Sequence, residues 1–147
     1  MVAPKESAER DVPLRYDRLD YTPLPKSVTL ARRRVHRLVT DWGHPELAAD
    51  IALLVSELSA NAVLHGCLRD RLFRVELGLT EHAVRVSVSD PKGESLPSPR
   101  VASQDEMFGR GLLIVREVAD RWGVEQLIVG KSVWCELDVV PRSGLAG

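Results

Sequence analysis

The chain has 147 residues, of which 44% are hydrophobic and 28% charged, and its formal net charge is −1. This length suits one domain with a substantial core, and the balanced charge gives no sign of nucleic acid or an acidic membrane surface as the main partner. We expect no apolar stretch of the roughly 20 residues that a membrane span needs, and the N-terminus lacks the apolar segment of a signal peptide. The sequence therefore predicts a cytoplasmic protein without direct nucleic-acid or membrane binding.

The two cysteines carry no sign of a metal or redox site. Cys67 and Cys135 have neither metal-ligand spacing nor a CxxC context. Isolated cysteines in a reducing compartment are usually buried packing residues. We expect that role for both.

The N-terminal part begins with a polar, proline-containing tail over residues 1–13. A short edge strand is expected within 14–24, where Pro23 and Pro25 stop it.

Two helices are expected next. Ser27 is a candidate N-cap for a helix that runs to about Trp42 and ends at Gly43. Pro45 suits the first turn of a second helix, which reaches about Leu64. One side of the first helix is apolar: Val28, Ala31, Val35, Leu38, Val39 and Trp42.

The middle of the chain predicts a hairpin and a long loop. Apolar and polar residues alternate over 72–79 and 83–90, and the short link 80–82 favours an antiparallel turn. Residues 91–108 contain three prolines and no periodicity. Connections of that length in compact domains are usually lids or binding loops.

The C-terminal part predicts a third helix over 109–122, capped by Gly123. Strands are expected over 124–129 and 132–140, joined at Gly130-Lys131. The strands thus occur in pairs rather than in a βαβ alternation. We predict an α+β two-layer sandwich with helices on one face of a mixed, mostly antiparallel sheet.

The expected domain covers residues 14–140 and is followed by a short tail, 141–147.

Two familiar phosphate-binding motifs fail. The tripeptide Gly130-Lys131-Ser132 ends like a P-loop, but the first glycine position is Glu125 and a strand follows instead of a helix. Gly109-Arg110-Gly111 is not preceded by a strand, and the third glycine position of a dinucleotide fingerprint is Ile114. A Gly-x-Gly at a helix start can approach an anion closely, or it can be a plain hinge.

The second helix carries a polar row beside its apolar stripe. At 100° per residue, this row lies about 100° to one side of the stripe and consists of Asp50, Glu57 and Asn61. His65 lies between the row and the stripe. Such a row either lines a pocket, where a carboxylate and a carboxamide suit Mg²⁺ and water, or forms a solvated flank. The stripe comprises Ile51, Val55, Leu58 and Ala62.

Several segments together resemble a known family. They are ELSANAVLHG (57–66), a strand ending in Asp90, a long loop, GRGLLIV (109–115), and ADRWGV…GKSVW. The set is similar to the GHKL ATPases, and most similar to the anti-sigma factor serine kinases and related small ATP-binding proteins. The resemblance covers residues 14–140 and implies the Bergerat-type ATP-binding fold, with ATP and Mg²⁺ as cofactors.

The resemblance also implies roles for individual residues. Asn61 would be the Mg²⁺ ligand, Glu57 the general base, and Asp90 the acceptor for the adenine amino group. Ser132 would reach the adenine side, and His65 would either touch phosphate or pack in the core. The phosphates would be held by Gly109, Arg110, Gly111 and Leu112.

The sequence departs from the family after Asp90. The usual Asp-x-Gly-x-Gly is replaced by Asp90-Pro91-Lys92-Gly93-Glu94, so one glycine is displaced to Gly93 and the other is missing. Pro91 also fixes φ directly after the aspartate. This stretch bears on the shape of the adenine pocket.

The function implied is that of an anti-sigma factor type serine/threonine protein kinase. It would sequester a sigma factor and phosphorylate a small antagonist protein, and the resemblance also suggests a homodimer. The alternative is a non-catalytic, nucleotide-gated binding module, because both need the same pocket.

Four arginines on the first helix allow two interpretations. Either they form a solvated polar face, or they form a docking patch for an acidic partner. They are Arg32, Arg33, Arg34 and Arg37.

Overall fold

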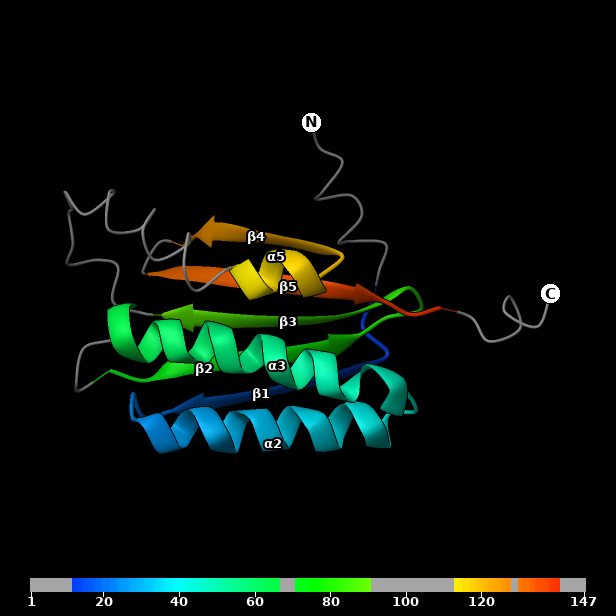
Figure 1. Cartoon of the computed structure of the whole chain (residues 1–147), viewed down its shortest axis with the longest axis horizontal. Coiled ribbons are helices and arrows are strands. Elements are labelled where there is room, and N and C mark those ends of the chain that lie inside the picture. Colours follow the sequence, from blue (N-terminus) through cyan, green and yellow to red (C-terminus); the bar gives the residue numbers. More distant parts are fainter. Residues whose placement is uncertain (1–11, 67–70, 91–112, 128–129, 141–147) are drawn as a thin grey trace.

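The computed structural model describes residues 12–66, 71–90, 113–127 and 130–140. Within these ranges the chain forms one sheet with helices packed over one of its faces (Figure 1). The predicted long loop, most of the N-terminal tail and the C-terminal tail lie outside the described residues.

The sheet has five strands in the order β1-β2-β3-β5-β4, and every pairing among the described residues is antiparallel. The expected edge strand and the hairpin are confirmed, and the mixed pairing is not seen in this part of the chain. The strands are β1 (Arg15–Tyr21), β2 (Phe73–Leu79), β3 (Ala83–Asp90), β4 (Arg121–Gln126) and β5 (Lys131–Asp138).

The helices cover the inner face of the sheet as a second layer (Figure 1). α3 packs against strands β2, β3 and β5, and it separates α2 from α5. The last turn of α3 widens into a π-turn, η1. The bounds are α2 (Pro25–Asp41), α3 (Pro45–Asn61), η1 (Ala62–Gly66) and α5 (Leu113–Val118). The predicted α+β two-layer sandwich is confirmed.

The hydrophobic core lies between these layers. Alternation in β2 and β3 places every second side chain against the helices, as the pairing of Val75 with Val88 and of Leu77 with Val86 shows. α3 contributes its predicted stripe. The largest fully buried side chains are Phe73, Ile51, Leu54, Leu77, Val35, Val39, Val55, Val84, Val86, Val115 and Cys135.

The start of α2 differs from the prediction. The N-cap residue is Leu24, which makes no side-chain cap hydrogen bond, and Pro25 occupies the first turn. Proline favours this position because its fixed φ suits a helix and its missing N–H would be unpaired there anyway. Ser27 is therefore inside the helix and buried, with its Oγ 3.2 Å from Thr22 Oγ1.

The third helix is shorter than predicted. α5 ends at Val118, and Trp122 and Gly123 belong to β4 instead of closing a helix. Trp122 pairs with Cys135, and a Cβ on Gly123 would lie 2.8 Å from the Trp134 ring. The glycine thus makes room for an indole on the neighbouring strand, and the predicted helix cap is wrong.

The expectation about apolar length is also wrong. The helical stretch Pro45–Leu64 has 20 residues and is apolar enough to pass a length-and-composition test for a membrane span. Its apolar side is covered by protein, because Ile51, Leu54 and Val55 are fully buried. In this fold the stretch is the core helix.

Candidate functional site

Three elements that carry predicted site residues meet at one end of the sandwich. The C-terminal end of α3, the end of β3 and the start of β5 lie together at the left of Figure 1. α3 and its π-turn both contact β3. Residues 57–61, Asp90 and 131–132 are thereby brought to the same end of the molecule.

Glu57 and Asn61 lie one turn apart on α3, and both are half-buried. Next to them, Leu58 and Ala62 are buried in the core. The pair therefore stands at the border between core and surface. A carboxylate and a carboxamide in this position can reach both a bound polar ligand and water.

Asp90 is the last residue of β3 and is only 6% exposed. It follows Val88 by two residues, so it lies on the inner face of the sheet, opposite Lys131 of β5. A carboxylate buried beneath the helix layer is suited to accept a hydrogen bond from a ligand that enters between α3 and the sheet.

Ser132 is buried as well, but its register differs. It pairs with Ser89, whereas Asp90 pairs with Lys131. Because side chains of neighbouring positions point to opposite faces of a sheet, Ser132 lies on the outer face and Asp90 on the inner one. The structure thus brings Asp90 and Ser132 to the same end of the sheet but not to the same face.

The remaining predicted residues fall outside the described part of the chain. They are Gly93, Gly109, Arg110, Gly111 and Leu112. His65 belongs to the π-turn that closes the α3 segment, and only its backbone is described. Their predicted roles stay predictions.

Two serines on α3 were not singled out by the sequence. The hydroxyls of Ser56 and Ser59 are buried and have no hydrogen-bond partner among the described residues. Buried hydroxyls normally find a partner, so these two are exceptions within the described part of the chain. In the sequence they differ from other helix serines only by lying close to Glu57. Their burial becomes visible only when the packing of α3 in the fold is known.

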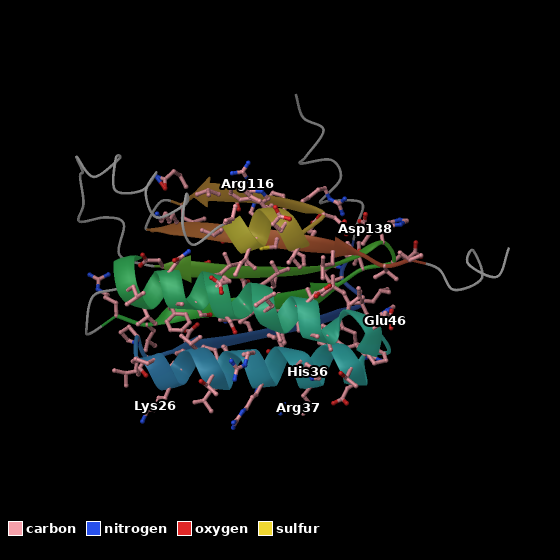
Figure 2. All side chains as sticks on the ribbon, viewed as in Figure 1. Lys26, His36, Arg37, Glu46, Arg116 and Asp138 are labelled. Carbon is pink, nitrogen blue, oxygen red and sulfur yellow. The ribbon has the colours of Figure 1, made fainter. Side chains whose placement is uncertain are left out.

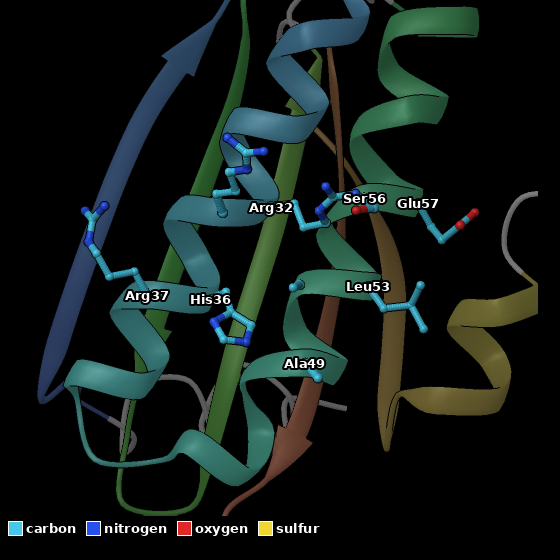
Figure 3. A pocket seen from close by; sticks show the side chains of 9 residues that line it. Arg32, His36, Arg37, Ala49, Leu53, Ser56 and Glu57 are labelled. Atoms are coloured by element: carbon cyan, nitrogen blue, oxygen red, sulfur yellow. The ribbon is translucent and has the colours of Figure 1, made fainter.

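A groove of about 700 Å³ runs between α2 and α3 (Figure 3). α3 contributes Ser56 and Glu57 to its wall, and α2 contributes mostly basic side chains. Glu57 therefore borders both the candidate site and this groove. The full lining is Arg32, Arg33, His36, Arg37, Ala49, Ala52, Leu53, Ser56 and Glu57.

A magnesium ion at this site would depend on few protein ligands. No group of three His, Cys, Asp or Glu side chains gathers anywhere in the described residues. Mg²⁺ at nucleotide sites needs no such cage, since one or two protein oxygens, substrate phosphates and water complete its shell. Half-buried Asn61, with Glu57 one turn away, fits that arrangement.

Cys135 takes no part in this chemistry. Its side chain is fully buried in the core, and burial raises the pKa of the thiol to about 12. A thiol with so high a pKa stays protonated and unreactive. The packing role predicted for Cys135 agrees with this burial.

Comparisons with known proteins place this fold in a class of nucleotide-binding domains. The model of the histidine kinase-like ATPase domain matches residues 21–135. The chain therefore belongs to the histidine kinase-like ATPase domain family. No curated protein matches the sequence.

A solved structure shares the fold. It contains the RsbU and RsbW domains of a Mycobacterium tuberculosis protein, with a TM-score of 0.64 and 18% sequence identity. The match covers 85% of this chain and 32% of that one, so this chain spans about a third of the length of that relative.

Proposed function

We propose that this protein binds Mg²⁺-ATP and transfers phosphate to a serine or threonine of a small protein partner. The observation that carries the proposal is the position of Glu57 and Asn61. They lie half-buried, one turn apart, on the helix that packs over β3, and β3 ends in buried Asp90. Membership of the histidine kinase-like ATPase family supports ATP as the ligand.

Each residue has a distinct binding task in this proposal. Asp90 accepts a hydrogen bond from the adenine amino group beneath the helix layer. Asn61 offers its carboxamide oxygen to Mg²⁺, which when bound neutralises phosphate charge. Ser132 lies on the outer face, so it contributes to the adenine side through the backbone of β5 or not at all.

Glu57 supplies the acid–base chemistry. Its carboxylate accepts the proton of the attacking hydroxyl while the hydroxyl oxygen bonds to the γ-phosphorus and ADP leaves. The half-buried position of Glu57 lets an outside hydroxyl reach it. Phosphoryl transfer asks little more of a protein than this base and correct placement of the reactants.

The regulatory role follows from the resemblance to the anti-sigma factor serine kinases. The partners we propose are a sigma factor, which the protein sequesters, and a small antagonist protein, which it phosphorylates. A homodimer is proposed on the same ground. The fold shared with a structure that contains an RsbW domain agrees with this assignment.

The test is transfer of label from γ-labelled ATP to the small antagonist. Glu57→Ala should abolish transfer and leave ATP binding largely intact, whereas Asn61→Ala should abolish both. Equal loss of binding and transfer in Glu57→Ala would contradict its role as base. Intact ATP binding with no transfer in the wild type would instead establish the non-catalytic, nucleotide-gated module.

A further inference from the structure

The groove between α2 and α3 is strongly basic. Arg32, Arg33, His36 and Arg37 line it from α2, and among the described residues Glu57 is the one carboxylate in the lining (Figure 3). The whole chain, in contrast, carries a net charge of −1. Positive charge is thus concentrated at this groove.

These arginines are not used by the fold. Within the described residues Arg32, Arg33 and Arg37 form no ion pair, and Arg32 and Arg33 are exposed. Arg34 on the same helix behaves differently, because its Nε and Nη2 donate to Asp17 at 2.9 and 2.7 Å. Unpaired arginines around a concave surface are available to a ligand, whereas Arg34 ties α2 to β1.

The α3 side of the groove is mostly apolar, with Ser56 and Glu57 as its polar residues. Leu53 is 38% exposed there, next to Ala49 and Ala52. The Ser56 hydroxyl is buried and has no partner among the described residues. The groove therefore offers an apolar strip next to a row of cations.

We propose that this groove binds an acidic, amphipathic segment of a protein partner. Carboxylates of the segment would pair with Arg32 and Arg33, and an apolar side chain would cover Leu53. Charge complementarity selects this occupant, and the exposed leucine favours a peptide over a purely ionic ligand.

The groove and the candidate site share Glu57. A partner docked along α2 and α3 is therefore held next to the proposed base, which increases the effective concentration of its hydroxyl. This last step rests on the proposed function, in that the docked protein is the phosphoryl acceptor. The binding itself requires no nucleotide.

The experiment measures binding of a fluorescent synthetic peptide that alternates acidic residues with leucine, at low and at physiological salt. We expect saturable binding that Arg32→Glu combined with Arg33→Glu weakens about tenfold or more, and that Leu53→Asp also weakens. Lys26→Glu is the control. It adds negative charge to the same helix, far from His36 and Arg37 (Figure 2), and should change affinity by less than about twofold.

Several results would overturn the inference. They are equal weakening by Lys26→Glu, equal affinity for a peptide in which serine replaces leucine, tighter binding of a DNA duplex or of anionic vesicles, and no saturable binding at all. Circular dichroism spectra must show that each variant is folded, and Arg32→Gln with Arg33→Gln provides a milder second pair.

Asn61→Ala separates this inference from the proposed function. It should bind the peptide like the wild type while losing Mg²⁺-ATP. If the wild type binds the peptide but not ATP, the proposed function fails and the groove stands. If it binds ATP but not the peptide, the groove fails alone.

Discussion

The two faces of the sheet treat polar side chains in opposite ways. On the outer face, arginines of β2, β3 and β4 pair with carboxylates of neighbouring strands: Arg74 with Asp20, Arg85 with Glu136, and Arg121 with Glu136 and Asp138. Arg85 also lies 4.2 Å from the centre of the Trp134 ring. The inner face is apolar over most of its area, with buried Asp90 at one end and Asp17 of edge strand β1 paired with Arg34 of α2.

The contrast indicates where ligands can bind. The charged side chains of the outer face form ion pairs with one another, so few of them remain to bind a ligand. On the helix side, Arg32, Arg33 and Arg37 of α2 form no ion pair among the described residues, whereas Arg34 of the same helix pairs with Asp17. The three arginines without an ion pair mark the surface proposed for the partner.

The largest expected effect comes from comparing adjacent residues of β2 that point to opposite faces. Phe73 is fully buried and stacks on Tyr21, with 5.6 Å between the ring centroids. Phe73→Ala should therefore lower the free energy of unfolding by about 3–5 kcal/mol. Arg74→Ala should cost less than about 1 kcal/mol, because exposed ion pairs contribute little. Urea denaturation measures both, and similar losses would show that the two faces do not differ in this way.

A smaller effect is expected from two glycines of the outer face. Gly123→Ala should cost about 1–3 kcal/mol, because the new Cβ would lie 2.8 Å from the Trp134 ring, which Arg85 covers. Gly78→Ala is the control, since its nearest atom would be 3.9 Å away. Equal thermal stability of the two variants would contradict the close packing at Trp134.

Two buried serines sharpen the comparison further. Ser59 is fully buried without a partner, so Ser59→Ala should leave stability unchanged or raise it by about 1 kcal/mol. Ser27 has Thr22 within hydrogen-bond distance, so Ser27→Ala should lower stability by about 1 kcal/mol. A loss of stability in Ser59→Ala, measured by chemical denaturation, would mean that its hydroxyl is satisfied after all.

The smallest effect concerns acid pH. Hydrogen bonding by Arg74 holds the pKa of Asp20 below its usual value of 3.8. A lowered carboxyl pKa contributes stability that is present above the unfolded pKa and is lost as pH falls through the folded pKa. Arg74→Ala should therefore flatten the fall in stability below about pH 4 only slightly, because solvent screens this exposed pair. A steeper fall in the variant would contradict the pairing.

Much of the fold could be predicted from periodicity. Alternation located β2 and β3, and the helical repeat placed Glu57 and Asn61 beside the stripe that is buried. The helix prediction over 119–122 is wrong because these few residues show no clear period, and the contact of Gly123 with a tryptophan on another strand is a tertiary feature. The predicted start of α2 is wrong because the helix begins at Pro25, two residues before the expected N-cap Ser27.

The site was only partly accessible from sequence. That Ser132 and Asp90 occupy opposite faces depends on the register of β3 with β5, which no local pattern states. The basic groove depends on how α2 packs against α3, so the arginines could be read either as a solvated face or as a docking patch. The structure adds the concave shape, and within its described residues Arg32, Arg33 and Arg37 form no ion pair.

The most direct test of the central claim is calorimetric titration of the purified protein with Mg²⁺-ATP, with Asn61→Ala and Asp90→Ala measured beside it. The structure predicts saturable binding by the wild type that both variants lose while their circular dichroism spectra stay those of the folded protein. Absence of binding in the wild type, or unchanged affinity in both folded variants, would contradict a nucleotide site between α3 and the end of β3.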